Sequence, residues 1–563
     1  MDDLPDALGR FAARLEMLER RVFVLEHPQE GSAKELALEA KPAMAAEPAD
    51  APGSAQAGGA FATVGKAMLG IAGAYLLRAI AESTSLPKMG LAAIAIAYAM
   101  LWLVWAARTP AGAWFVSTTY ACTSALILAP MLWELTLSFK VLPATVSAGV
   151  LCVFVYAGTA LAWRRNQPSV NWVATVSALV VALALSLATH EMAAFLAALL
   201  AMAILQEFAA LRNHGSSLRV LVVAAVDLEI AAFLYIYAGP PSDRAEYPPL
   251  GIAALLAPAL ALFLICGMSV AIKTLLLKQK ITAFETTQTM IAFLLAACGL
   301  LVFMPGSGAM ILGILCLVLS AAGYAAVFAF FAREPERRNE RVFSTWSGAL
   351  LVAGSLLCLA PVNAALWLGA AAIAAVGLGV RWHRLTLEFH GLAFLVAAAI
   401  ASGLLDYDFR ALAGTLPGAP AWIIWAITVC AGICYAVEKP FVGEAWEQQA
   451  LHLVTALVAI GGVAALLVQG LMWVTALSVN PGAHHVAFLR TLTICLTVLA
   501  LAFSGSHWRR LELTRIGYIA LALVAVKLVF EDLRLGHLEF ISASIFLFAI
   551  TLMAVPRIVR MAQ

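Results

Sequence analysis

Charged residues are scarce in this sequence. Asp, Glu, Lys and Arg make up 12% of the 563 residues and hydrophobic residues make up 63%, whereas about 25% of a soluble domain is charged. From Phe61 onward, apolar runs of about 20 residues follow one another with short breaks, and this is the length that a helix needs to cross a bilayer. The composition therefore excludes an ordinary soluble protein and predicts an integral membrane protein in contact with the lipid bilayer.

Several features of nucleic-acid-binding proteins and enzymes are also missing. The net charge is only +2, and without a basic domain nucleic acid is not an expected partner. All nine cysteines lie inside apolar runs rather than in loops, where disulfides or zinc sites are expected. A metal or redox pair at Cys430 and Cys434, which share a helix face, is the alternative. No P-loop, zinc-protease or serine-nucleophile pattern stands in a suitable setting, so no catalytic residue, metal or cofactor is predicted.

The first 60 residues form the polar part of the chain. Residues 1–28 lack the apolar stretch of a cleavable signal peptide, so we expect the N-terminus to stay in the cytoplasm. Within residues 8–25, apolar residues repeat at steps of three and four, as in a short coiled-coil seam: Leu8, Phe11, Leu15, Leu18, Val22 and Leu25. This segment either binds a protein partner or a second copy, or lies as an amphipathic helix on the membrane. Residues 29–60 are rich in Ala, Pro, Gly and Glu and predict a disordered linker.

Residues 61–563 predict a transmembrane domain, an all-α bundle of about eighteen helices. Two of these spans are expected at residues 386–405 and 419–437. Its loops are at most about a dozen residues long, which leaves no room for a soluble catalytic domain. With the N-terminus inside, the cytoplasmic loops and the C-terminal tail hold twenty Lys and Arg residues, and the opposite loops hold five: Lys88, Lys140, Arg244, Arg410 and Arg534. This bias follows the positive-inside rule. We therefore predict an even number of spans, with both termini cytoplasmic.

Two stretches resemble a known family. They are GKAMLGIAGAYLLRAIAESTSLPKMGL at the first predicted hairpin and LALVAVKLVFEDLRLGH at the last. With the N-terminal seam, the linker and the series of spans, they are similar to the bacterial multi-span membrane proteins grouped as domain of unknown function 2339. In the second stretch, Lys527, Phe530, Asp532 and Leu533 fit that family's run of lysine, aromatic, aspartate and leucine. The resemblance implies a helical fold in a bacterial inner membrane and implies no reaction.

Charged side chains inside spans are costly, so each is a candidate for a substrate or ion pathway. Seven are predicted near the outer ends of spans: Arg78, Glu82, Glu134, Arg490, Lys527, Glu531 and Asp532. Arg78 and Glu82, like Lys527 and Glu531, are four residues apart and share a helix face. If the first and last hairpins meet, these groups form a charged vestibule facing the periplasm. The alternative is ion pairing between helices, with the long cations reaching toward the headgroups.

A second set opens spans on the cytoplasmic side. Glu285, Glu388 and Glu447 stand in first helical turns, where the helix dipole favours acids, so capping accounts for them. His390 and His452 lie deeper and titrate near neutral pH. These two histidines are candidates for a proton relay, with hydrogen bonding between helices as the alternative.

Asp227 and Glu229 are the deepest acids, halfway along a predicted span. Being two residues apart, they point about 200° from each other, so at most one faces a given cavity. A buried carboxylate there is protonated or paired, and such a group is how proton-coupled carriers bind and release their ion. The alternative is a neutral acid hydrogen-bonded between helices.

Two stretches in predicted outer loops carry weaker signals. Asp406 to Asp408, in the sequence DYD, suggest a metal-assisted sugar transferase, but no second acidic motif accompanies them. His484 and His485 are adjacent, so their side chains point apart, and we expect a solvated loop rather than a metal site.

These observations favour a carrier or translocator of a small or amphipathic solute, because charges inside the membrane are numerous and soluble domains are lacking. Asp227, Glu229, Arg78, Glu82, Lys527 and Asp532 are expected to line its route. One alternative is a non-catalytic scaffold of envelope biogenesis that recruits a partner through its N-terminal seam. A third is an intramembrane enzyme acting on lipid-linked substrates near Asp406 and Asp408.

Overall fold

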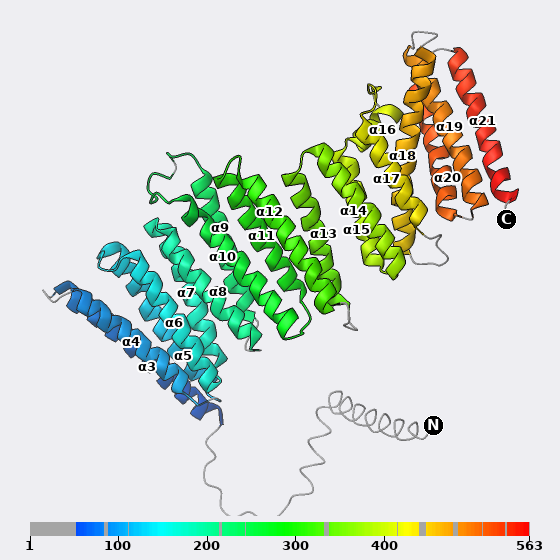
Figure 1. Cartoon of the computed structure of the whole chain (residues 1–563). Helices are drawn as coiled ribbons and strands as arrows, with labels where there is room; N and C mark the ends of the chain where they lie inside the picture. The colour runs from blue at the N-terminus through cyan, green and yellow to red at the C-terminus, as the bar shows by residue number, and fades with distance from the viewer. Residues whose placement is uncertain are drawn as a thin grey trace, which may run out of the picture. The chain divides into compact units, whose positions relative to one another are not determined.

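The described part of the chain consists of α-helices and short π-helical turns, with no strand (Figure 1). The structure, a computed structural model, describes residues 52–83, 88–110, 112–212, 217–242, 244–331, 337–413, 415–438, 446–476, 482–508, 510–534 and 538–561. The predicted seam at residues 8–25 lies outside these ranges. The predicted all-α fold class is confirmed.

The helices follow the predicted apolar runs closely. In chain order they are α3 (Pro52–Ser83), α4 (Lys88–Arg108), α5 (Trp114–Trp133), η1 (Glu134–Ser138), α6 (Ala144–Arg165), α7 (Pro168–Thr189), α8 (Met192–Leu211), α9 (Ser217–Ala238), α10 (Ile252–Ala271), η2 (Ile272–Leu276), α11 (Ala283–Phe303), α12 (Gly308–Ala326), η3 (Val327–Phe331), α13 (Arg338–Cys358), α14 (Pro361–Trp382), α15 (Leu385–Ala401), α16 (Leu404–Leu412), α17 (Trp422–Val437), α18 (Trp446–Ala476), α19 (Ala483–His507), α20 (Leu511–Lys527), η4 (Leu528–Asp532) and α21 (Leu538–Met561). The elements labelled η are π-helical turns. α3 begins at Pro52, nine residues before the predicted start at residue 61.

Local sequence sets many helix ends. Pro168 and Pro361 stand at the first positions of α7 and α14, where the missing N–H costs nothing. Thr282 and Glu285 form a reciprocal capping box at the start of α11, which satisfies two free N–H groups. Asn166 ends α6 in the left-handed conformation, as short polar residues do at helix C-termini.

Among the described residues, sixteen helices are long and apolar enough to cross a membrane, where about eighteen were predicted. The other two predicted spans depart from straight full-length helices. The predicted span 386–405 is the pair α15 and α16, which is bent by 68°. The predicted span 419–437 is α17, which has 16 residues and is short for a bilayer core of about 30 Å.

Large apolar side chains cover the outer faces of the helices. Trp105, Leu228 and Phe530 are 44%, 65% and 74% exposed, and side chains of this kind are exposed along most of the spans. Such extensive apolar surface needs an apolar surrounding. Together with the long apolar helices, it indicates a lipid bilayer.

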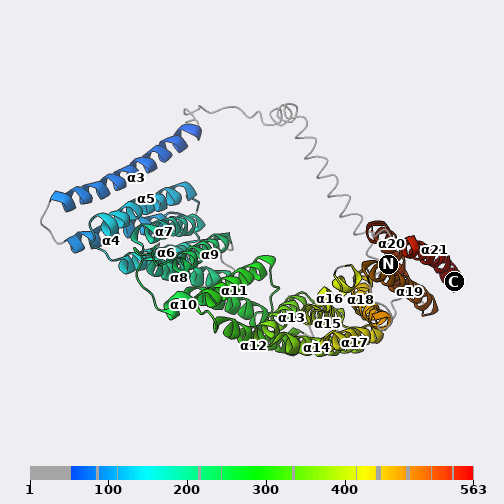
Figure 2. The same cartoon turned by 90° about the horizontal axis from the view of Figure 1, so that it is seen from above.

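Contacts divide the chain into two units, Met1–Gly73 and Ala74–Gln563. Within the second unit, neighbours in sequence are neighbours in space: the colours pass in order from α4 to α21 in both views (Figures 1 and 2). The closest pairs are successive helices such as α4 with α5, α6 with α7, α12 with α13 and α14 with α15. Among the described helices, substantial contacts join elements no more than three places apart in chain order.

Glycines permit the close crossing of α12 and α13. A Cβ atom added at Gly354 would lie 2.8 Å from the backbone oxygen of Gly313 on the facing helix. No side-chain adjustment relieves such a contact, so the two backbones approach this closely only because both positions are glycine.

We expect Gly354→Ala to lower the stability of the protein by about 1–3 kcal/mol, because the new methyl group forces the two backbones apart. The readout is the apparent melting temperature in detergent micelles at a fixed scan rate. Gly377→Ala on α14 is the matched control, since a Cβ there meets nothing within 4 Å. Equal melting temperatures for the two variants would contradict this account of the crossing.

Candidate functional site

The break between α15 and α16 is the main irregularity among the apolar helices. α15 ends at Ala401, and Gly403 adopts a left-handed conformation with φ of +75°. Glycine populates this region without the strain that a Cβ atom brings. The Ser-Gly pair at residues 402–403 thus turns the chain by 68° into α16.

Asp408 on α16 is buried without a partner. It is 9% exposed, and its Oδ1 atom accepts no hydrogen bond from the described residues. Its neighbours on α16, Leu404, Tyr407 and Ala411, belong to an apolar cluster that α14, α15, α17 and α18 complete. The hydroxyl of Tyr407 is buried and unpartnered as well.

Two glycines on α18 make room for this acid. A Cβ atom at Gly461 would lie 3.1 Å from Oδ2 of Asp408, and one at Gly462 would lie 2.6 Å from the Thr428 hydroxyl on α17. Among the sixteen described spans, α18 is also the most enclosed, because 61% of its apolar 18-residue stretch is buried. Asp408 and Thr428 therefore both face the small-residue surface of one buried helix.

The far end of α16 is held by a network of four charges, the α19–α20 network, formed by Arg490, Lys527, Glu531, Asp532 and the hydroxyl of Thr491. Arg490 is 4% exposed. It donates to the carbonyls of Ala411 and Arg410 at 2.7 and 2.9 Å and to Glu531 at 2.8 Å. A guanidinium at a helix C-terminus satisfies free carbonyls and complements the helix dipole.

Lys527 completes the α19–α20 network. Its Nζ atom lies 2.9 Å from Asp532 Oδ1, 2.7 Å from the Thr491 hydroxyl and 3.4 Å from Glu531 Oε2. Thr491 donates to the other oxygen of Asp532 at 2.8 Å. The two cations and two acids balance, which offsets much of the cost of burying them. The structure thus brings together four of the predicted site residues: Arg490, Lys527, Glu531 and Asp532.

A second buried acid lies at the other end of α18, in the Glu438 cluster, formed by Glu438, His452, Thr455, Arg510 and Glu512. Glu438 is 1% exposed. Its Oε1 atom accepts a hydrogen bond of 3.0 Å from Thr455, while Oε2 is buried without a partner. Burial raises the pKa of Glu438 to about 7, although His452 and Thr455 favour the charged form.

His452 stands between two carboxyl groups. It is 4% exposed, and Nδ1 lies 3.7 Å from Oε1 of Glu512, which is too long for a hydrogen bond. Arg510 donates to the backbone oxygens of Glu438 and Tyr435 at 3.0 and 3.3 Å, so its charge is directed at the end of α17. The predicted candidate His452 therefore lies beside Glu438 and Glu512, two acids that were not among the predicted site residues.

A third set of buried charges, the α8–α11 network, joins four helices. Arg219 lies 2.6 Å from Glu207 and 2.9 Å from Glu285, and Lys273 lies 2.6 Å from Glu285. Ser269 donates to the second oxygen of Glu207 at 2.5 Å. Capping accounts for only part of the role of Glu285, because this residue also binds both cations.

Asp227 and Glu229 face different helices, as their spacing predicts. The half-buried Asp227 accepts both its hydrogen bonds, of 3.0 and 2.9 Å, from Gln288 on α11. Glu229 is 3% exposed and accepts a hydrogen bond from Ser186 on α7. The side chain of Glu229 is thus buried between helices, whereas that of Asp227 is only half-buried.

Within the described residues, the charged side chains of the first and last hairpins have separate partners and form no common vestibule. Arg78 pairs with Glu134 on η1 at 2.5 Å, whereas Lys527 and Glu531 pair within the α19–α20 network. Substantial contacts of α4 and α5 are with α6 and α7, and those of α20 are with α18, α19 and α21. The side chain of Glu82 lies outside the described part of the chain.

His390, His484 and His485 contact side chains of neighbouring helices. His390 is 7% exposed, and its Nδ1 lies 3.0 Å from the Tyr324 hydroxyl while Nε2 is unpartnered. His484 and His485 lie in the first turn of α19 rather than in a solvated loop, because both rings pack on Phe540. No group of three His, Cys, Asp or Glu side chains within the described ranges is arranged to hold a metal ion.

The acids of the DYD stretch lie on a helix rather than in an outer loop. Asp406 is exposed and pairs with Arg410 one turn later at 3.0 Å, whereas Asp408 is buried. Two residues on a helix point about 200° apart, so Asp406 and Asp408 do not hold one ion together. Asp408 thus gains importance as a single buried acid, and the Ser-Gly pair inside an apolar run is the sequence signal that could have indicated the break.

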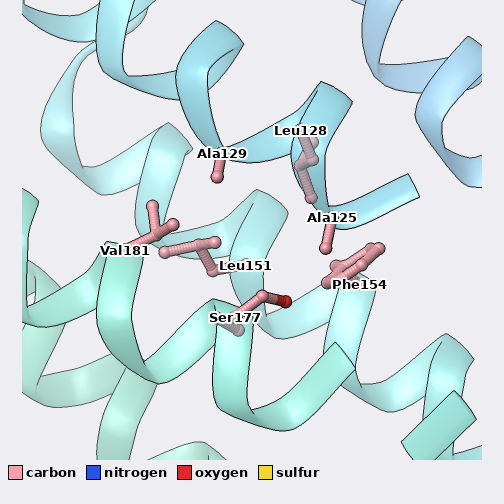
Figure 3. A pocket seen from close by; sticks show the side chains of 8 residues that line it. Ala125, Leu128, Ala129, Leu151, Phe154, Ser177 and Val181 are labelled. Carbon is pink, nitrogen blue, oxygen red and sulfur yellow. The ribbon is translucent and has the colours of Figure 1, made fainter. Parts of the chain in front are cut away.

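An apolar pocket between α5, α6 and α7 offers no polar recognition (Figure 3). It is too narrow to hold a water molecule and is lined by Ala125, Leu128, Ala129, Leu151, Phe154, Ser177, Ala178 and Val181. The one hydroxyl, that of Ser177, donates to Val173 on its own helix at 2.7 Å. We therefore place the candidate site at Asp408 and α18.

We expect Arg219→Gln to destabilise the protein by about 3–5 kcal/mol, because it leaves Glu207 buried without its cation. Melting in detergent provides the measurement. The same substitution at the exposed Arg165 at the end of α6 is the control and should change little. The double variant Arg219→Gln with Glu207→Gln should recover part of the loss, and a loss equal to the sum of the two single variants would argue against the pairing.

Comparison of this chain with known proteins does not assign it a function. No protein-family model, no curated protein and no solved structure matches this chain. The residues around Asp408, Glu438 and α18 are therefore the observations from which its activity is inferred.

Proposed function

We propose that this chain is a carrier of a small or amphipathic solute, and that Asp408 is the group that gains and loses a proton during its cycle. The observation that carries the proposal is the burial of Asp408 without a countercharge at a broken helix. Carriers place substrate and coupling-ion sites where a helix is interrupted within the membrane. Apart from Glu438, the other buried acids of the described chain have hydrogen-bonding or charged partners that explain them, as in the α8–α11 and α19–α20 networks.

The chemistry of an isolated buried acid supports this role. A carboxylate without a cation is far more costly in an apolar surrounding than the neutral acid, so Asp408 holds a proton while its pocket stays closed. Release of the proton requires that water or a cationic group reach it. Because Gly403 turns the chain and Gly461 leaves no side chain in the contact, a small shift of α16 against α18 opens this access.

Asp227 belongs to the same proposal as a second polar point on the route. It is half-buried and bound by a neutral amide, Gln288, so it keeps an exchangeable carboxyl group. Arg490, Lys527, Glu531 and Asp532 act instead as structural charges within the α19–α20 network, and Arg78 pairs with Glu134. Glu229 is held by a hydrogen bond from Ser186.

A scaffold is the second candidate function. The observation that favours it is the serial packing of the helices, in which buried charges tie neighbouring helices together. In this account residues 8–25 recruit a protein partner or a second copy. Deletion of residues 1–30 then removes the phenotype, whereas a carrier keeps most of its transport.

The membrane arrangement is part of the proposal. In this proposal, the chain crosses a bacterial inner membrane an even number of times. The number is about eighteen when the bent pair α15–α16 and the short α17 are each counted as one crossing. Both termini then lie in the cytoplasm, as the excess of Lys and Arg in alternate loops predicts. The resemblance to domain of unknown function 2339 suggests the same location.

Asp408→Asn should reduce proton-coupled transport to the level of protein-free vesicles, because the amide cannot carry the proton. The measurement uses proteoliposomes with a pH-sensitive dye inside, exposed in turn to a panel of amino acids, sugars and amphipathic solutes. Asp406→Asn is the matched control, since this acid lies two residues away on the same helix, is exposed and pairs with Arg410. Equal acidification by wild type and Asp408→Asn with any transported solute would refute the role of Asp408.

For the orientation, cysteines introduced at Arg337 and Asp406 should react with a membrane-impermeant maleimide from opposite sides of the membrane. This follows because three helices, α13, α14 and α15, separate the two positions, and Asp406 is exposed in the first turn of α16. The background variant has its nine native cysteines replaced by serine or alanine. Labelling of both positions from the same side would require a different number of crossings.

A further inference from the structure

α18 contacts both the Glu438 cluster and Asp408, through Thr455 and Gly461. Thr455, Gly462 and Gln469 are spaced by seven residues, so they lie on nearly the same face of the helix. His452 precedes Thr455 by one turn. Thr455 donates a hydrogen bond to Glu438. Two turns further along α18, Asp408 packs on Gly461 and Thr428 of α17 packs on Gly462. The surface that holds Asp408 is therefore continuous with the surface that holds Glu438.

Buried groups with polar atoms free of hydrogen bonds contact this helix at two places, Asp408 beside Gly461 and the Glu438 cluster beside Thr455. Glu438 is 1% exposed with Oε2 free of hydrogen bonds, and His452 is 4% exposed with Nδ1 in the same state. Unpaired polar atoms in a buried place are costly, so a role beyond packing is expected where they gather. The separation from Thr455 to Gly461 is six residues, or about 9 Å along the helix axis.

We infer that α18 carries the proton route of the carrier, with Glu438 and His452 as the relay that exchanges protons between Asp408 and the aqueous phase at the N-terminal end of α18. This inference rests on the proposed function and identifies the coupling ion of the carrier as the proton. One free carboxyl oxygen takes one proton, whereas a metal cation takes about six oxygen ligands at once.

The transfer balances as follows. A protonated Glu438 loses the hydrogen of its carboxyl O–H bond, an O–H bond forms on the Asp408 carboxylate, and the negative charge moves to Glu438. At rest the Thr455 hydroxyl donates to Glu438 and the Thr428 hydroxyl donates to the carbonyl of Ile424. Both hydroxyls can also accept, and water that enters when α16 shifts carries the proton across the roughly 9 Å between Thr455 and Gly461. Glu438 then regains a proton from His452, whose imidazolium form gives up its N–H proton and is recharged from water.

The charges around Glu438 suit this exchange. His452 and Thr455 face it from α18, Glu388 from α15 and Arg510 from the start of α20, and His452 in turn faces Glu512. Burial raises the pKa of Glu438 to about 7, so its carboxyl is mostly protonated below pH 7 and mostly charged above. A relay works best when its pKa lies near the working pH.

The experiment measures how quickly the buried carboxyls exchange hydrogen for deuterium. Infrared spectra of the full chain in reconstituted membranes show the carbonyl stretch of each protonated carboxyl, and the band lost in Asp408→Asn belongs to Asp408. After a change to D2O, this band shifts as O–H becomes O–D. We expect Glu438→Gln to slow the shift by about 100-fold, the lower range for a positioned proton-transfer group. A second band should be present at pH 5, absent at pH 9 and missing in Glu438→Gln.

Thr455→Val tests the route without removing an acid. It should slow the exchange at Asp408 as well, whereas Thr497→Val on α19 should not, because that hydroxyl bonds only its own helix backbone at Thr493. Unchanged exchange at Asp408 in both Glu438→Gln and Thr455→Val overturns the inference, as does a wild-type spectrum without an Asp408 band. If Asp408→Asn abolishes transport while Glu438→Gln leaves exchange unchanged, only this inference fails. If exchange slows but Asp408→Asn transports normally, only the proposed function fails.

Discussion

A charge that leaves water has to meet an opposite charge or take up a proton, and the buried polar groups of this protein are arranged by that constraint. In the α8–α11 network, Arg219 and Lys273 neutralise Glu207 and Glu285. In the α19–α20 network, two cations again meet two acids. Isolated ions in such places cost several kcal/mol each, so these balanced sets are the form in which charges persist between apolar helices. Asp408 and Glu438 have no such neutral set, and this difference separates them from the rest.

The broken helix and the α19–α20 network form one unit. A helix that ends within an apolar region leaves carbonyls without partners, and these must be satisfied by protein groups. Arg490 supplies the donors for the carbonyls of Arg410 and Ala411 at the end of α16. Its own charge then needs Glu531, and Glu531 brings Lys527 and Asp532 with it. The cost of interrupting α16 is therefore met by charges on three other elements.

Much of the fold followed from the sequence, because apolar runs of span length are a local property. The all-α class, the positions of sixteen spans and the capping of α11 by Glu285 could be predicted in this way. The break at Gly403 was marked only by a Ser-Gly pair, and the π-helical turns had no sequence signal that we recognise. The bent pair was therefore predicted as one straight span.

The partners of the buried charges could not be predicted, because they join helices far apart in sequence. Arg219 and Glu285 are separated by 66 residues, and Arg490 and Glu531 by 41. The first and last hairpins, which look alike in sequence, have different partners. Glu438 follows an apolar run and precedes Lys439 and Pro440, so it looked like a loop residue. Its burial depends on α18 and Arg510, which only the folded chain brings to it.

The position of both unpaired acids against α18 has a mechanical consequence. Asp408 touches this helix through Gly461 and Glu438 touches it through Thr455, while α16 and α17 carry the acids themselves. The contact at Gly461 has no side chain that interlocks with α16, whereas the hydrogen bond from Thr455 fixes Glu438 in register. Any displacement of α16 therefore changes the distance between the two acids and leaves the relay end in place. This asymmetry links movement of the broken helix to the protonation of Asp408, which is the link that coupled transport requires.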